Sequence, residues 1–518
     1  MELRDSSAYK PTVENVVERE GNKTARRDFR SQVTVVSACL LVGISFGMSL
    51  GHSAVLLPRL QAANSSLYVD EDTTSWIISL NAGAGPLGCL IGGTMIDHWG
   101  RRKICFLANI GLFLGGLLVC LAQRVPMLMS GKTIEGFFRS MVATSLTVLA
   151  DELADPKFRG FTVCIVITFG SIGVMAITSL GTLWPWRRAA WVTTTVFLLS
   201  VLPLVLVSES PSWLARKGRL EEAARSLKWL WGPGREMEAE EDLAFLISRN
   251  NSTHRQSRSH QGFLKSCREF FTSRILKPFF ILHFFNTIQI FCGFGIFTFY
   301  AVDILLKIRE AGDKENSMDE NFSAVIMSFV RIVGNATATL LMIRVGRRPL
   351  ALISGVGITM SALTLGVVLI LQSIQNISFG SDWLTLTLTV LFIWFHSFGF
   401  NQLTILMIGE TQAAHVRGFA CGYIYTINDI VLGGTLKFYH SLLRNLQIHG
   451  LFLMFGISCL ICTIFVYFFL PETQGRTLEQ IEDYFRQPNV MWVTRKKSTQ
   501  SERTCEQSTT EVTTALDK

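Results

Sequence analysis

The sequence lacks a catalytic constellation, a cluster of metal ligands and a framework of paired cysteines. Nine of its 11 cysteines fall in long apolar runs, and the other two, Cys267 and Cys505, fall in polar segments, so no disulfide framework is indicated. Cys459 and Cys462 have the spacing of half a metal site, but two further ligands are missing. We therefore expect no enzymatic activity, no bound metal and no cofactor.

A nucleotide site is not expected either. Gly83, Gly85 and Gly88 match the letters of the dinucleotide fingerprint GxGxxG, but they lie in an apolar run with no preceding strand. Small residues at such spacing let membrane helices pack closely. We interpret this stretch as a packing surface.

Charged residues are scarce, at 17% of the chain, whereas hydrophobic residues make up 49% and the mean hydropathy is +0.35. The apolar residues come in runs of about 20, the length that a bilayer demands of a helix. The chain is therefore expected to be a polytopic membrane protein. Its net charge of +8 gathers near the amino terminus, between spans and in the central segment, as the positive-inside rule requires, so no nucleic-acid partner is needed to explain it.

The apolar runs place six spans on each side of a polar central segment. The first set lies at 33–57, 75–96, 104–123, 126–150, 161–185 and 189–207, and the second at 278–301, 322–343, 350–372, 383–408, 419–441 and 450–470. No small-residue cleavage site precedes the first span, so it is expected to be an uncleaved signal-anchor. An even number of spans puts both termini in the cytosol.

The predicted organisation is a cytoplasmic tail (1–30), a six-helix bundle (31–207), a cytoplasmic helical linker (208–277), a second six-helix bundle (278–470) and a cytoplasmic tail (471–518). The linker contains an apolar stripe made of Trp213, Leu214, Leu220, Leu227 and Leu230, which ends before Gly232. We expect short amphipathic helices under the bundle, and the alternative is a solvated linker. The polar tail past Phe485 is expected to be disordered.

The predicted outer loops are acidic and carry glycosylation sequons at Asn64, Asn321 and Asn376. Other sequons, at Asn22, Asn250, Asn251 and Asn335, fall in inner segments or within a span, so sequons alone do not fix the orientation. The inner cations and the acidic outer loops support this orientation, and we expect a glycoprotein of the plasma membrane.

The stretch from Gly93 to Lys103 marks the mouth of a hairpin between two spans. Asp97 ends the apolar run, Gly100 turns the backbone and three cations follow, which fixes the loop in the cytosol. A second copy, Gly346-Arg347-Arg348, lies between two later spans.

Two further motifs repeat about 260 residues apart, which indicates that the chain is built from two related halves. Glu152 with Arg159 recurs as Glu410 with Arg417, and Glu209 recurs as Glu472. Such repeats are typical of carriers in which one half rocks against the other.

These motifs, together with Trp186-Arg187, Pro211-x-Trp213-Leu214 and the run from Pro471 to Glu479, resemble the sugar porter family of the major facilitator superfamily, and most of all its insect members of the facilitated-trehalose-transporter type. The resemblance spans about residues 30–485. It implies an all-α polytopic fold of twelve transmembrane helices in two six-helix bundles. It also implies a monomer that binds a small solute, expected to be a sugar, between the bundles near the midplane.

The resemblance also implies a gating set, made of Asp97, Arg101, Arg102, Glu152, Arg159, Glu209, Arg347, Glu410, Arg417 and Glu472. We expect its carboxylates to face its arginines, to latch the halves on the inner side and to release when the inside opens. The alternative is that each pair is a static cap that fixes a helix end.

The chain departs from the family at the positions that contact the sugar. The candidate solute-contact residues at these positions are Gln289, Ile167, Ile290, Gly295, Asn401, Gln402, Ile405, Asn428 and Asp429, of which Ile167 replaces a glutamine and Ile405 and Asp429 replace tryptophans. A site that loses partners for sugar hydroxyls should lose affinity, so glucose is not favoured. A carrier for a sugar or for another small organic solute, and a non-transporting receptor or scaffold, both stay open.

Span four carries three charges, Lys132, Glu135 and Arg139, so that Glu135 can pair with either cation on one helix face. In proton-coupled relatives a cation at the position of Lys132 pairs with an acidic residue on span one, whereas span one of this chain has no acidic residue. Facilitated diffusion is therefore expected. His52, on span one, could titrate in the physiological range or could simply be hydrogen-bonded.

Two further charges lie at similar depth near the bilayer centre, Asp429 on span eleven and Arg331 on span eight. We expect them to form a pair, either direct or through water or solute, because a bare charge at that depth is costly. The alternative is a protonated Asp429 that only donates or accepts hydrogen bonds.

Overall fold

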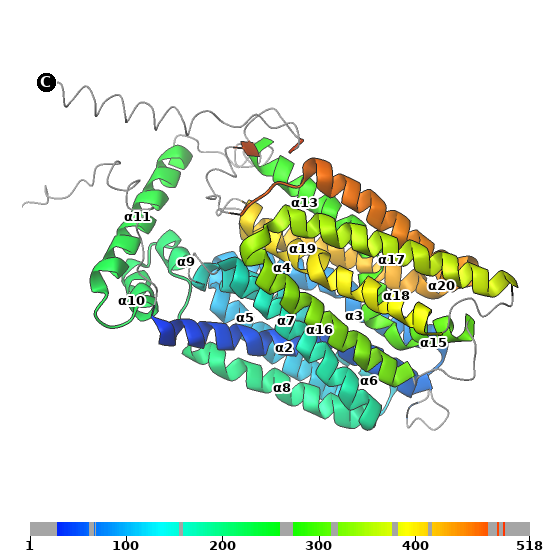
Figure 1. Ribbon diagram of the computed structural model, residues 1–518. Helices are drawn as coiled ribbons and strands as arrows, with labels where there is room; N and C mark the ends of the chain where they lie inside the picture. The colour runs from blue at the N-terminus through cyan, green and yellow to red at the C-terminus, as the bar shows by residue number, and fades with distance from the viewer. Residues whose placement is uncertain are drawn as a thin grey trace, which may run out of the picture.

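The computed structural model describes residues 28–61, 67, 69–154, 159–258, 273–311, 320–375, 382–412, 417–474, 484–485 and 491–492. Long helices lie side by side in this part of the chain, which contains no β-strand (Figure 1). The expected all-α fold is confirmed.

The amino-terminal half consists of helices α2 to α8. They are α2 (Phe29–Gln61), α3 (Glu71–Gly83), α4 (Gly85–Trp99), α5 (Arg101–Cys120), α6 (Val125–Leu153), α7 (Arg159–Leu183) and α8 (Trp186–Leu206). Helices α3 and α4 together form one span, interrupted at Ala84 just before Pro86, because proline cannot donate a backbone hydrogen bond.

The carboxyl-terminal half consists of α13 to α20. They are α13 (Ser273–Phe291), α14 (Phe294–Phe299), α15 (Ala301–Ala311), α16 (Glu320–Val345), α17 (Arg347–Gln375), α18 (Asp382–Phe395), the π-helical turn η1 (His396–Phe400), α19 (Asn401–Thr411) and α20 (Arg417–Phe469). Gly293, with φ 94°, breaks the predicted seventh span into α13 and α14. Gln447, with φ 55°, marks the break between the two predicted spans that α20 contains.

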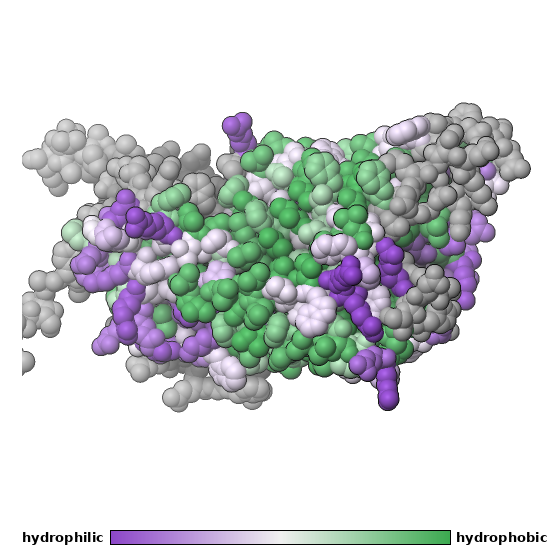
Figure 2. Space-filling model, turned by 90° about the horizontal axis from the view of Figure 1, so that it is seen from below, coloured by the Kyte–Doolittle hydropathy of each residue, from purple (hydrophilic) through white to green (hydrophobic). Residues whose placement is uncertain are grey.

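Nine helices among the described residues are long and apolar enough to cross a membrane. These nine helices account for ten of the twelve predicted spans, because α20 contains two. The other two are α6, whose charges keep it out of the nine, and the seventh span, which is broken into two shorter helices. Each of the twelve predicted spans is therefore helical. On the face seen in Figure 2, hydrophobic residues fill the middle of the bundle and hydrophilic residues gather toward its two ends. Exposed apolar residues such as Leu202, Leu340 and Met360 supply such a lipid-facing surface.

The linker helices are α9 (Pro211–Arg216), α10 (Leu220–Trp231) and α11 (Glu236–Arg258), and they lie at one end of the bundle (Figure 1). We call this end the latch end. Leu227 and Leu230 are buried as expected, but Leu220, at the start of α10, is 42% exposed, so its place in the buried stripe was wrong. Gly232 ends α10 with φ 79°.

One part of the polar tail packs on the bundle, contrary to the expectation of disorder past Phe485. Trp492 is 2% exposed, packs against Tyr484, and donates its backbone N–H to the carbonyl of Phe468 at 2.9 Å. Its indole ring buries a large apolar surface, which offsets the entropy of ordering the segment. Of the sequons, Asn64 and Asn376 lie outside the described residues, and Asn321 lies in the first turn of α16.

The two halves pack against each other along two seams. In the first, α3 and α4 pack on α20, and in the second, α7 packs on α16 (Figure 1). The first seam is tight because both sides lack side chains: a Cβ on Gly93 would lie only 3.0 Å from the Cα of Gly422.

Candidate transport site

The motif at the start of α5 is built around one buried guanidinium. Arg101 is 1% exposed, and its Nε donates to Glu152 Oε2 at 2.9 Å while its Nη2 donates to Asp97 Oδ1 at 3.1 Å. The hydroxyl of Ser210 also donates to Glu152. A guanidinium fork between two carboxylates is a strong, directional contact.

A second carboxylate caps the helix that carries this arginine. Glu209 Oε1 accepts the backbone N–H groups of Arg101 and Arg102 at 2.9 and 3.1 Å, which satisfies donors in the first turn of α5. Gly100 precedes them with φ 107°, and a Cβ there would lie 2.5 Å from Glu209 Oε2. Only glycine fits this turn.

The carboxyl-terminal half repeats the arrangement, except that it has no counterpart of Asp97. Arg347 Nη2 donates to Glu410 Oε1 at 2.8 Å, and Glu472 accepts the backbone N–H groups of Arg347 and Arg348 at 3.1 and 3.0 Å. Thr473 takes the place of Ser210, and its hydroxyl donates a hydrogen bond to Glu410. We call the two clusters the latches.

Each latch lies within one half, so these ion pairs hold helices of the same half together and do not pair the halves directly. The expectation that the pairs cross between the halves was wrong for Arg101 and Arg347, and for Arg159 and Arg417 it stays a prediction. The reason is geometric, because the arginine and the glutamate of each ion pair come from helices of the same six-helix bundle. The side chains of Arg159 and Arg417 lie outside the described residues.

Contact between the halves at the latch end comes from helix N-termini. A Cβ on Gly418, in the first turn of α20, would lie 2.7 Å from Asp97 Oδ2, and a Cβ on Gly160, in the first turn of α7, would lie 3.0 Å from Arg347 Nη2. Asp97 therefore reaches across to the positive end of a helix in the other half, which favours a carboxylate.

A network of amides and hydroxyls closes the α7–α16 seam. Gln402 Nε2 donates to the carbonyl of Asn335 at 2.7 Å and to Thr339 Oγ1 at 3.0 Å, while Thr168 on α7 lies 3.2 Å from Thr339. Asn335 Nδ2 donates to Ser171 on α7 at 2.6 Å. Gln402 is fully buried, so in this state it holds the seam rather than facing a solute.

The other predicted solute-contact residues lie on α7, α13, α14, α19 and α20, and their role as solute contacts stays a prediction. Asn401 donates to Asn335 at 3.4 Å, and Gln289 and Ile290, near the end of α13, are 7% and 4% exposed. Ile167 and Ile405 pack on the apolar core. Gly295 faces Leu432, and Asn428 Oδ1 is buried without a hydrogen bond.

Asp429 crosses between the halves near the middle of the bundle. Its Oδ2 accepts from Ser140 Oγ at 2.7 Å and from Cys89 Sγ at 3.7 Å, both on the amino-terminal half. A Cβ on Gly85 would lie 2.3 Å from the same oxygen, so glycine makes the room. The predicted pair with Arg331 was wrong, because Asp429 faces α4 and α6 whereas Arg331 faces α2 and α7.

The charges of α6 are buried and partly paired. Lys132 Nζ lies 2.8 Å from Glu135 Oε2 and 3.0 Å from His52 Nδ1, and Ser49 donates to Glu135 Oε1 at 3.0 Å. The expected pairing of Glu135 with a cation of its own helix is confirmed with Lys132. Arg139 is 3% exposed and lies within electrostatic range of Asp429.

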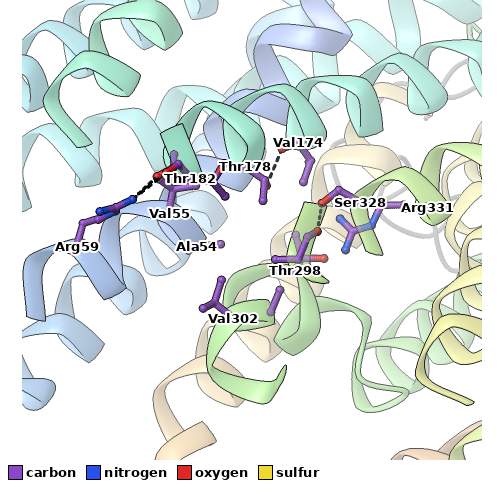
Figure 3. Close-up of a pocket in the computed structure, with 13 residues that line it drawn as sticks. Ala54, Val55, Arg59, Val174, Thr178, Thr182, Thr298, Val302, Ser328 and Arg331 are labelled. Carbon is purple, nitrogen blue, oxygen red and sulfur yellow. Dashed lines mark hydrogen bonds between the residues drawn. The ribbon is translucent and has the colours of Figure 1, made fainter. Parts of the chain in front are cut away.

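A cavity lies between the halves on the side away from the latch end (Figure 3). Its volume is about 30 Å³, and its polar lining residues are Arg59, Thr178, Thr182, Thr298, Ser328 and Arg331, from α2 and α7 on one side and α14 and α16 on the other. A volume of that size holds one or two water molecules. The sequence singled out only Arg331 among them, because a lone hydroxyl in a span gives no periodic signal.

The nine described cysteines are free, and the described residues contain no group of metal ligands. Many buried hydroxyls bond to a carbonyl of their own helix, as Thr144 does to Ser140 at 2.8 Å, whereas Ser49, Ser140 and Ser210 bond to carboxylates. Hydroxyls, amides and arginines from both halves line the α7–α16 seam and the cavity, and such a lining suits the binding of a small solute.

Comparison with known proteins agrees with this geometry. The facilitated trehalose transporter Tret1 of Culex quinquefasciatus is 28% identical over 456 residues, which cover 87% of this chain and 85% of that protein. Tret1 of Apis mellifera ligustica is 28% identical over 462 residues, covering 89% of each. The structure of the proton:xylose symporter XylE bound to 6-bromo-6-deoxy-D-glucose matches with a TM-score of 0.71 at 17% identity, covering 88% of this chain and 99% of that one, and so shares the fold.

A profile of the family described as "Sugar (and other) transporter" matches residues 35–485. That range contains both latches, both seams and the cavity between the halves. A multi-pass membrane carrier, not an enzyme, is what this architecture and these relatives have in common, and the chain belongs to the family of sugar and other transporters.

Proposed function

We propose that this protein moves a sugar or a sugar-like solute across the plasma membrane by alternating access and facilitated diffusion. The observation that carries the proposal is the pair of matching latches, one in each half, at the end of the bundle opposite the cavity. Two rigid halves that meet through glycines and hydrogen bonds can separate at one end while they close at the other.

The described state is closed at the latch end, which we propose faces the cytosol. Opening there would separate Asp97 from the first turn of α20, and Gly93 from Gly422. The latches keep each hairpin mouth rigid during this motion, since their ion pairs lie within one half. The solute would enter from the cavity side, widen the cavity and leave through the latch end.

The substrate assignment rests on two observations. The Tret1 relatives are facilitated trehalose transporters, which supports a sugar as solute. Hydroxyls of Thr178, Thr298 and Ser328 face the cavity from both halves, and each can bond to a solute hydroxyl. We further propose that the protein works as a monomer with both termini in the cytosol.

A downhill mechanism is supported by the partners of Lys132. Its carboxylate partner is Glu135, on its own helix, and α2 contributes only Ser49 and His52 to the cluster. Both members of this ion pair belong to one helix, so the movement of the halves need not change the surroundings of the Glu135 carboxylate.

Uptake into proteoliposomes tests the proposal. The purified protein should take up at least one solute from a panel of trehalose, hexoses, polyols and small organic acids, with counterflow when the lumen is preloaded. Gly93→Leu should block uptake, because the side chain would prevent closure of the α4–α20 seam, whereas Gly83→Leu should not, since a Cβ on Gly83 meets no atom within 4 Å. A folded, reconstituted protein that moves none of these solutes would favour the receptor or scaffold alternative.

A further inference from the structure

Arg139 is a buried arginine whose hydrogen-bonding capacity the protein leaves partly unused. The residue is 3% exposed, and its Nε and Nη2 have no hydrogen-bond partner among the residues that the structure describes. Arg101, which is also buried, shows the contrast, because its Nε, Nη1 and Nη2 donate to protein oxygens at 2.9, 3.0 and 3.1 Å. A buried donor without an acceptor costs free energy, so a ligand that supplies oxygen acceptors would stabilise the site around Arg139.

Arg139 lies at the centre of the membrane, in a helix that touches both halves. It is the middle residue of α6 (Val125–Leu153), roughly 21 Å from either end of the helix. Helix α6 packs on α2 and α4 of its own half and contacts α19 and α20 of the other half. A solute that moves from the cavity of Figure 3 to the latch end passes this level. An ionisable residue at such a depth marks a functional position by default.

The charge of Arg139 is balanced, although its hydrogen bonds are not. Asp429, from the other half, lies within electrostatic range of Arg139, and its carboxylate accepts from Ser140 at 2.7 Å. Lys132 and Glu135, the nearest other charges on α6, pair with each other at 2.8 Å. These charges therefore sum to zero. An anionic solute would add a charge without a counter-charge, whereas a neutral solute would keep the balance.

A hydroxyl group suits both members of this charged pair. The hydrogen bonds that the described residues make to Asp429 end on Oδ2, and Asp429 is half-buried, so Oδ1 is left for a further donor. The free N–H groups of Arg139 need acceptors. A hydroxyl accepts through its lone pairs and donates its hydrogen, so neighbouring hydroxyls of one solute can serve the guanidinium and the carboxylate together.

We propose that Arg139 is a solute-binding residue, whose free N–H groups donate to the oxygens of a neutral, hydroxyl-bearing solute while Asp429 supplies the counter-charge. The planar fork of the guanidinium would orient two such oxygens at once. This inference rests on the proposed carrier function and deepens it. It names a binding residue on α6 that belongs neither to the latches nor to the positions expected to contact a sugar.

Thermal stabilisation of the full-length protein in detergent and uptake into proteoliposomes test the inference. Trehalose, glucose and mannitol are the neutral probes, and glucuronate and gluconate are the charged ones. At least one neutral probe should raise the melting temperature of the wild-type protein, because a ligand stabilises the state that binds it, and should be taken up. Neither acid should have these effects.

Substitution of Arg139 should weaken binding of that neutral probe. Arg139→Gln should raise its concentration at half-maximal uptake about tenfold, because hydrogen bonds from a charged donor are lost. Arg139→Lys should retain part of the affinity, since lysine keeps the charge but lacks the fork. Arg124→Gln is the matched control and should change neither uptake nor stabilisation, because Arg124 is exposed and directly precedes the same helix.

A double variant separates binding from a purely structural role. Arg139→Gln alone leaves the Asp429 carboxylate without its counter-charge, which should lower the stability of the protein. Arg139→Gln/Asp429→Asn restores the balance of charge and should recover that stability, but not the binding of the probe, since the guanidinium donors are still missing. Wild-type affinity in the double variant would overturn the inference, and so would binding of the acids in preference to the neutral probes.

The two assays also distinguish this inference from the carrier function. Uptake of a neutral probe that is unchanged in the double variant would leave the carrier function standing and remove Arg139 from the binding site. A probe that stabilises the wild-type protein but not the double variant, and that is not taken up, would support the binding site and overturn the carrier function. A folded protein that neither binds nor moves any probe would overturn both.

Discussion

Asp429 on α20 accepts a hydrogen bond from Ser140 on α6 at 2.7 Å, and this bond joins the two halves of the transporter near the middle of the membrane. The carboxylate fits into a socket whose walls are Gly85, Cys89 and Ser140, with Arg139 within electrostatic range. Since the socket belongs to one half and the carboxylate to the other, the contact exists only while the halves are closed along the α4–α20 seam.

Removal of the donor should therefore favour opening at the latch end. Ser140→Ala leaves the Asp429 carboxylate without its short hydrogen bond, which costs about 1.5–3 kcal/mol for a charged acceptor, or a shift of about ten- to hundredfold in the equilibrium. Cys164 reports opening of the other seam, because its Sγ lies 3.4 Å from Met342 Sδ across the α7–α16 contact. Its labelling by an impermeant maleimide should accelerate in Ser140→Ala and not in Ser130→Ala, whose exposed hydroxyl bonds only to Pro126. Equal labelling rates in Ser140→Ala and Ser130→Ala would show that the contact between Asp429 and Ser140 does not control opening.

A methyl group inside the socket should have the same effect by a different route. In Gly85→Ala the new Cβ would lie 2.3 Å from Asp429 Oδ2 and 2.7 Å from Ser140 Oγ, so the carboxylate must move away. We expect uptake to fall several-fold and Cys164 labelling to rise. Gly83→Ala, two residues earlier and in open space, is the control and should behave as wild type. If Gly85→Ala behaved like Gly83→Ala, the α4–α20 seam would accommodate the added methyl group without any effect on transport.

Much of the fold and of the latches could be predicted from the sequence. Span positions follow from run length, because a bilayer sets the number of apolar residues. The pairing of Arg101 with Glu152 and of Arg347 with Glu410 could be anticipated because the motifs recur in the same order in both halves. What the motifs did not reveal is that each pair closes within its own half.

The partner of Asp429 could not be predicted, and the reason is helix rotation. Depth along a span follows from counting residues, and it places Asp429 and Arg331 at a similar level. The direction of each side chain around its helix depends on packing, and it turns Asp429 toward Ser140 and Arg331 toward the cavity. The partners of Gln402 could not be predicted for the same reason, since Thr168 and Thr339 come from two other helices.

Asp97 should be essential, whereas the equivalent position in the second half, Ile343, should not. Asp97 binds Arg101 at 3.1 Å and approaches the first turn of α20, so Asp97→Asn removes a charge from an ion pair and from a helix N-terminus. We expect uptake to fall about tenfold, a loss of about 1.4 kcal/mol. Ile343→Asp should change uptake much less. Uptake is corrected for surface expression, and an Asp97→Asn variant as active as wild type would show that this contact is static.

Transport should not depend on a proton gradient. Lys132 is matched by Glu135 on its own helix, and α2 supplies Ser49 and His52 to the cluster but no acid. Addition of a protonophore at a clamped membrane potential should leave initial uptake rates unchanged. A collapse of uptake under these conditions would establish proton coupling and would point to Glu135 or Asp429 as the carrier of the proton.

Breaking the Lys132–Glu135 pair should be more harmful than removing it. The two charges lie 2.8 Å apart and are 0% and 1% exposed, so Glu135→Gln leaves an ammonium buried with His52 and no counter-charge. The loss of a single partner in such a pair costs about 3–5 kcal/mol, whereas apolar replacement of both is often close to neutral. The double variant Lys132→Met/Glu135→Gln should therefore recover most of the thermal stability in detergent that Glu135→Gln loses. Glu222→Gln, which breaks the exposed Arg219–Glu222 pair at the same i, i+3 spacing, is the control and should change stability little. Additive losses in the double variant would show that the two side chains act independently and that the membrane core tolerates each charge alone.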